Sequence, residues 1–225
     1  LPTETMEDIE GIANLAQKVV DLYYSLPTRP KGRSVSVSIS CACFVPKPFT
    51  PFQFEGQDTM ELLREKQKHL LASVKSKKIS VSYHDADVSF IEAILAKGDR
   101  RMGPVSLSAW KKGSKLDGGY EYFDPQRWYE AMAECGLDPA FYANRHRDYD
   151  EVMPWDHLDF CVSKEFLIRE NKIARQSATT PQCRERCSAC GANCLPGRGR
   201  CPANVATIPA DPTLAPLEQP APQPP

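Results

Sequence analysis

The pattern of apolar and polar positions predicts alternating helices and strands over the first part of the chain. Apolar residues recur at helical spacing over residues 9–23, behind a capping-box run that begins at Thr5. Serine then alternates with valine or isoleucine through residues 34–44, which predicts a strand with one apolar face. A charged amphipathic helix at 59–77 and a short strand at 79–83 follow. A helix that joins two strands at these lengths favours a parallel α/β architecture.

The rest of the chain is predicted to be mainly helical. Asp87 is a candidate N-cap for a helix that ends at Gly98, and three further helices are expected at about 105–112, 125–135 and 163–176. The chain therefore divides into an α/β portion, a helical extension, a cysteine-rich knob and a disordered proline-rich linker, at residues 1–83, 84–178, 179–201 and 202–225. Two or three strands are too few for a closed parallel barrel, so further strands are expected upstream of Leu1.

Composition narrows the class of protein. Hydrophobic residues make up 41% and charged residues 25% of the 225 residues, and the formal net charge is −1. These values are ordinary for a globular domain, and they give no overall field that would draw the protein to nucleic acid or an anionic membrane. No apolar run approaches the roughly 18–20 residues that span a bilayer, and the N-terminal segment has no signal-peptide pattern. We therefore expect a cytoplasmic protein with no membrane partner.

Four cysteines are spaced as metal ligands. Five of the nine cysteines lie within residues 183–201, a distribution typical of cytosolic thiols plus a metal site. Three, two and three residues separate Cys183, Cys187, Cys190 and Cys194, while Gly191 permits a tight turn between them. Four thiolates can close a structural zinc site or hold an iron–sulfur cluster, and the sequence does not separate the two. Reduced cysteines without a ligand and a redox pair are the alternatives.

Two stretches resemble the late strands of the barrel in radical S-adenosylmethionine enzymes. In that family a Gly-x-x-Glu loop follows the fifth strand, and residues 1–4 match all of it but the glycine. The next strand commonly ends in a Phe-x-Pro…Thr-Pro-Phe stretch, which residues 44–52 match. Runs farther along resemble the extension of a subgroup in which a cobalamin-binding-like domain precedes the barrel; they lie at residues 89–93, 97–101, 109–110, 154–157 and 162–167.

The resemblance implies a fold and an activity. Residues 1–83 would be the C-terminal portion of a partial (β/α) radical-enzyme barrel. Its partner would be the upstream remainder of the same chain, where three cysteines would hold the catalytic [4Fe-4S] cluster that cleaves S-adenosylmethionine. Glu4 would shape the loop beneath this cofactor, and Phe44 would lie beside its adenine. The substrate and any use of cobalamin stay open, and residues 1–225 alone are expected to be inactive.

Cys183, Cys187 and Cys190 also reproduce the spacing of that catalytic cluster. The catalytic cysteines belong after the first barrel strand, however, whereas only a proline-rich tail follows here. We therefore interpret the C-terminal cysteines as a separate structural or electron-relaying site. The competing hypothesis is a non-catalytic zinc-knuckle module that binds a protein or nucleic acid. The near-neutral charge and the lack of interleaved aromatic residues in the knob weigh against nucleic acid.

Overall fold

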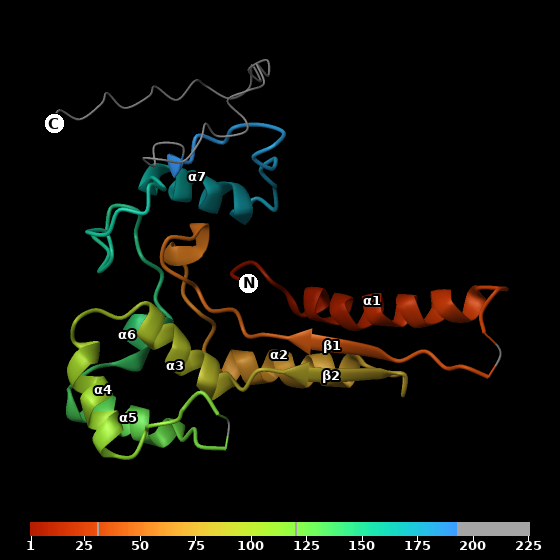
Figure 1. Cartoon of the computed structure of the whole chain (residues 1–225), viewed down its shortest axis with the longest axis horizontal. Helices are drawn as coiled ribbons and strands as arrows, with labels where there is room; N and C mark the ends of the chain where they lie inside the picture. Colours follow the sequence, from red (N-terminus) through yellow and green to blue (C-terminus); the bar gives the residue numbers. More distant parts are fainter. Residues whose placement is uncertain (31, 120, 193–225) are drawn as a thin grey trace.

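The chain folds as a mostly helical α/β protein with a small parallel sheet (Figure 1). The computed structural model describes residues 1–30, 32–119 and 121–192. Cys194, Cys201 and the predicted linker 202–225 lie outside the described residues. The elements, in chain order, are α1 (Met6–Ser25), β1 (Val37–Cys41), the 3-10 helix η1 (Pro51–Phe54), α2 (Met60–Ser73), β2 (Ile79–Tyr83), α3 (Ala86–Ala96), α4 (Met102–Lys111), α5 (Pro125–Glu134), α6 (Pro139–Ala143) and α7 (Lys164–Arg175).

The predicted β-α-β unit is present as β1, α2 and β2. The two strands pair in parallel, with Val37 opposite Ile79 and Cys41 opposite Tyr83. β1 is shorter than the predicted strand at 34–44, because β2 offers only five residues for pairing. Within the described residues, β2 is the only strand that pairs with β1, so the other edge of β1 is open, as the strand count predicted.

The two faces of this sheet differ. Ile39 and Ile79 are buried against Ala16 and Val20 of α1, and α1 in turn packs on Leu70 of α2. Both helices therefore cover the apolar face. The opposite face carries only exposed serines, namely Ser38, Ser40, Ser80 and Ser82.

Capping residues set where the helices begin. The capping box predicted at Thr5 is present: the Thr5 hydroxyl accepts a hydrogen bond from the amide of Asp8 (3.3 Å), and the Asp8 carboxylate accepts one from the amide of Thr5 (2.8 Å). The prediction of Asp87 as the N-cap of α3 is wrong, because Asp85 accepts the amide hydrogen bonds of that first turn. Asp87 instead accepts a hydrogen bond from the Tyr129 hydroxyl at 2.9 Å and binds Arg64.

Helices α3 to α6 share one core. Its largest buried members are Phe90, Ile94, Val105, Met132 and Tyr142. Among the residues that the structure describes, no helix is both long enough and apolar enough to cross a membrane.

Helix α7 packs against η1 and carries the cysteine-rich segment. Phe54 of η1, Leu167 of α7 and Trp155 form a small buried cluster between them. The Ser163 amide donates to the carbonyl of Cys190 at 2.9 Å. Gly191 has a φ of +95°, and a Cβ there would lie 2.7 Å from the Cys161 carbonyl oxygen. The backbone turn at this position therefore requires glycine.

Candidate functional site

A cavity of about 440 Å³ opens at the carboxyl end of the two parallel strands. Its walls come from the loop before α1, from α1 itself, from the chain that leaves β1 and from α2. In parallel α/β sheets the carboxyl end of the strands is the usual ligand-binding edge, because the loops that follow the strands gather there. The location alone makes this cavity a candidate site.

Both predicted cofactor contacts line this cavity. Glu4 lies in the loop before α1, and Phe44 lies just beyond β1, so the two come from separate segments of the chain. The Phe44 ring makes an edge contact with Phe52, with the ring centroids 5.4 Å apart. The Phe44 carbonyl accepts a hydrogen bond of 2.9 Å from the side-chain amide of Gln57, a residue that is 3% exposed. These contacts fix the backbone where it passes the cavity.

A buried lysine holds the polar wall together. The Lys66 amine donates to the carboxylates of Glu4 (2.8 Å) and Asp58 (2.7 Å), and the residue is 9% exposed. Burial by itself favours the neutral amine, but the hydrogen bonds to Asp58 and Glu4 outweigh it and raise the pKa of Lys66. One ammonium is thus paired with two carboxylates in this wall.

Sequence reasoning missed Lys66 and Asp58. The available signal was the position of Lys66 in the pattern of α2, three residues after buried Leu63 and four before buried Leu70. A lysine on the apolar stripe of an amphipathic helix is seldom buried unless it is paired with a carboxylate.

The rest of the cavity is apolar or weakly polar. Ile9, Ile12, Leu63 and Leu70 supply aliphatic surface. Burial raises the pKa of the Cys41 thiol, and the nearby Glu4 carboxylate adds to that effect, so the neutral thiol is favoured. The cavity therefore combines aliphatic surface with one polar wall of paired charges.

In the sequence, the predicted metal ligands follow α7, whereas the elements that form the cavity precede it. Cys183 is exposed, whereas Cys187 and Cys190 are half-buried. Across residues 1–30, 32–119 and 121–192, no three histidine, cysteine or carboxylate side chains are grouped so that they could hold a metal ion. Cys194, the fourth predicted ligand, lies outside this part of the chain.

The fold and cavity define an α/β protein with a ligand-sized pocket at its strand ends. No family model matches the chain. No solved structure matches it either. A protein of Methanocaldococcus jannaschii that is described as uncharacterized is 33% identical over 126 residues, which are 52% of this chain and 26% of that protein. The chain thus spans about a quarter of this relative, whose description assigns no activity.

Proposed function

We propose that this chain is the C-terminal part of a radical S-adenosylmethionine enzyme and that the cavity at the strand ends is part of its cofactor pocket. One observation carries the proposal: Glu4 and Phe44, which the resemblance assigns to the cofactor, line the same cavity. The one-sided sheet supports it further. The strands of a (β/α) barrel carry their helices on the outer face alone, which is how α1 and α2 cover β1 and β2.

The residues of the cavity fit this cofactor. Its volume of about 440 Å³ falls in the range of roughly 300–1,000 Å³ that is usual for small-molecule pockets. The aliphatic surface of Ile9 and Ile12 and the ring of Phe44 suit an adenine, while the carboxylates of Glu4 and Asp58 suit the sulfonium and amino groups. The chemistry supplied by the bound cofactor is hydrogen abstraction by a carbon radical, formed with an electron from a [4Fe-4S] cluster.

The chain's own residues bind and orient. Lys66 holds the Glu4 carboxylate at the rim, and Gln57 holds the carbonyl of Phe44 in place. The cluster ligands would come from another part of the protein. By itself, the present chain is therefore expected to cleave no S-adenosylmethionine.

The test uses the whole protein that contains this chain, reconstituted with iron, sulfide and a reductant, and measures 5′-deoxyadenosine. We expect Glu4→Gln and Phe44→Ala to weaken S-adenosylmethionine binding about tenfold each, since each removes roughly one good contact. Glu7→Gln is the matched control, because Glu7 is exposed in the first turn of α1 and does not line the cavity. If the two cavity variants bind as well as the control, the cofactor assignment is wrong.

We also propose that Cys183, Cys187, Cys190 and Cys194 hold zinc or an iron–sulfur cluster. Besides the spacing, two hydrogen bonds support an ordered segment here: Ser163 donates to the carbonyl of Cys190, and Arg169 donates to that of Ser188. The turn at Gly191, where only glycine fits, is a further sign that this segment is ordered.

Metal analysis of protein purified without oxygen tests this site, and visible absorbance separates iron–sulfur from zinc. We expect Cys187→Ser to lose metal and Cys135→Ser, at the end of α5, to retain it. Absence of metal in the parent protein refutes the site. Bound zinc in a protein that fails to bind S-adenosylmethionine would favour the competing zinc-knuckle module.

A further inference from the structure

A second cavity, of about 900 Å³, lies where three loops meet. One loop carries Pro48 and Phe49, the second joins α3 to α4 at residues 96–101, and the third is the turn at 154–158. Each loop contains one of the runs that the sequence analysis singled out, although the runs are far apart in the chain. Each run taken alone can be explained by solvated charged side chains and buried aromatic residues. That explanation does not say why all three runs meet at one cavity.

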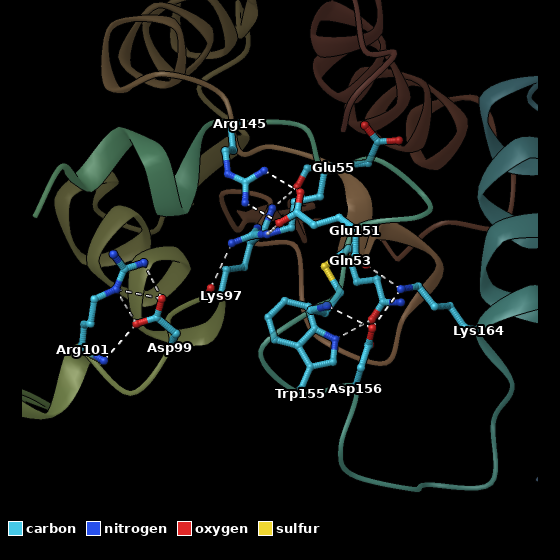
Figure 2. A network of polar contacts seen from close by, with 12 residues as sticks. Gln53, Glu55, Lys97, Asp99, Arg101, Arg145, Glu151, Trp155, Asp156 and Lys164 are labelled. Atoms are coloured by element: carbon cyan, nitrogen blue, oxygen red, sulfur yellow. Dashed lines mark hydrogen bonds and ion pairs between the residues drawn. The ribbon is translucent and has the colours of Figure 1, made fainter.

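A buried glutamine joins two of these loops. Gln53 is 2% exposed, and its side-chain oxygen accepts hydrogen bonds from the Phe49 amide (3.0 Å) and from the Trp155 indole (2.9 Å). Asp156 fixes the same turn by accepting from the Met153 amide at 3.0 Å. Figure 2 shows Gln53 directed at the Trp155 indole, with the Asp99–Arg101 pair set apart from them. The cavity walls are therefore formed before any ligand binds.

The charges at the rim are not all explained by the fold. Asp99 accepts from the Arg101 amide (2.9 Å) and from its guanidinium (2.6 Å), so this pair, just before α4, is locally neutral. Arg100 lies between them in sequence and is exposed; its guanidinium makes no ion pair or hydrogen bond with the described residues. His157, on the facing turn, is exposed as well.

Two buried basic residues adjoin lining residues of the cavity, Lys97 next to Ala96 and Gly98 in sequence and Arg147 against the Trp155 ring. Lys97 and Arg147 are 0% and 1% exposed, and the Arg147 guanidinium lies 5.7 Å from the centre of the Trp155 ring. Burial and the charges of Arg147 and Arg145 lower the pKa of Lys97 to about 7. The shift arises mainly from burial, so Lys97 is only partly charged near neutral pH, and the positive charge of the cavity comes from Arg100 at its rim.

The walls between these charges are apolar. They are formed by Pro48, Phe49, Pro154, Trp155 and Leu158. We propose that this cavity binds an organic phosphate that carries a flat ring, that is, a nucleotide unit, with Arg100 and His157 at the phosphate and Phe49 and Pro154 against the ring. Guanidinium groups match phosphate geometry, and aromatic rings stack on bases. The site is separate from the strand-end cavity and does not rest on the radical chemistry.

The experiment titrates the full chain with AMP, with adenosine and with a single-stranded hexauridylate. Calorimetry measures the affinity for each. We expect AMP to bind at least tenfold more tightly than adenosine and Arg100→Gln to weaken AMP at least tenfold. Lys111→Gln is the matched control, because Lys111 is an exposed cation of α4 that does not line the cavity. Both substituted side chains are exposed, so circular dichroism should show the parent fold in both variants.

The outcomes separate cleanly. If hexauridylate binds more tightly than AMP and Arg100→Gln weakens its binding as well, the nucleotide unit comes from RNA. If hexauridylate binds more weakly than AMP, the ligand is a free nucleotide. AMP that binds no more tightly than adenosine overturns the proposal. So does an Arg100→Gln variant that binds AMP as well as Lys111→Gln.

Discussion

Lys97 shows how one buried charge links two parts of the molecule. Its side chain extends from the end of α3 into the interior, where the amine donates to the backbone carbonyl of Glu55. Its own carbonyl accepts from Arg147 at 3.0 Å. Figure 2 shows Lys97 within the network that also contains Glu55 and Arg145. A lysine in this position stabilises the loop after η1, but the protein must bury an amine beside two arginines.

The pKa of Lys97 predicts a pH dependence of stability. Folding lowers this pKa to about 7, while the unfolded chain keeps the proton up to about pH 10. Unfolding therefore takes up a proton between these values, and the contribution of Lys97 to the free energy of unfolding rises with pH across this window. The slope is at most ~1.4 kcal/mol per pH unit. Below about pH 7 the contribution is constant, because both states hold the proton.

Urea unfolding at several pH values between 7 and 9.5 measures this slope. We expect Lys97→Met to remove it and Lys111→Met, an exposed site, to retain it. Equal slopes in the parent and Lys97→Met would show that the amine titrates normally in the folded protein.

At the scale of elements, local periodicity sufficed for some parts of the fold and failed for others. The β1-α2-β2 unit and the Thr5 capping box could be predicted, because alternation and capping are properties of neighbouring residues. The pairing of Gln53 with Trp155 could not, because it joins residues 102 positions apart. The short helices η1 and α6, of four and five residues, leave too few turns for a periodic pattern.

The residues of the candidate site also divide into those that the sequence indicated and those that it did not. Glu4 and Phe44 were found through a resemblance between short runs, and no periodicity pointed to them. Lys66 interrupts the apolar stripe of α2, and only the contacts with Glu4 and Asp58 reveal its role. The second cavity was beyond reach, because its three loops are brought together by tertiary packing alone.

The contact between the loop after η1 and the end of α6 depends on a glycine. A Cβ on Gly56 would lie 2.0 Å from the backbone carbonyl oxygen of Asn144, and the adjacent Gln57 amide already donates to Ala143 at 2.8 Å. We expect Gly56→Ala to lower the free energy of unfolding by ~1–3 kcal/mol, because the backbones must separate. Thermal and urea denaturation measure the change.

Gly103 is the matched control for that substitution. It lies in α4, and a Cβ there would meet nothing within 4 Å. Gly103→Ala is expected to stabilise the helix by up to ~1 kcal/mol, because alanine has the higher helix propensity. A Gly56→Ala protein that is as stable as Gly103→Ala would contradict the tight contact.

At the scale of the whole molecule, one carboxylate attaches α7 to the body. Glu55 is 3% exposed and accepts hydrogen bonds from Arg175 (2.7 Å from both Nε and Nη2) and from Asn171 (2.9 Å). Burial acts to raise the pKa of this carboxyl, but the hydrogen bonds from Arg175 and Asn171 outweigh it and lower the pKa. In Figure 1, α7 and the residues that follow it as far as 192 lie apart from helices α3 to α6.

This attachment should weaken in acid. Because folding lowers the pKa of Glu55, its stabilisation is complete above about pH 4.3, the usual unfolded value, and is lost as pH falls through the folded value. Arg175→Met should cost ~1–2 kcal/mol at pH 7, less than a fully buried pair, because the Arg175 side chain is 45% exposed.

Limited proteolysis after α7, together with urea unfolding, measures this loss. The difference between the parent and Arg175→Met should shrink below about pH 4. Lys68→Met, at an exposed site on α2, serves as the control and should leave both readouts unchanged. An Arg175→Met protein that resists protease as well as this control would show that the Arg175–Glu55 pair does not hold α7 on the body.

The open edge of β1 has a consequence for hydrogen exchange. In a parallel ladder, successive residues direct their backbone groups to opposite sides. Val37 donates to the Lys78 carbonyl at 2.8 Å, so the Ser38 and Ser40 amides point to the side on which the described residues place no strand. The serine face also admits water. Deuterium should therefore replace the Ser38 and Ser40 amide protons quickly and those of Val37 and Ile39 slowly. A strand that joins this edge would slow exchange at the two serines alone, which makes their amides a direct reporter of sheet extension.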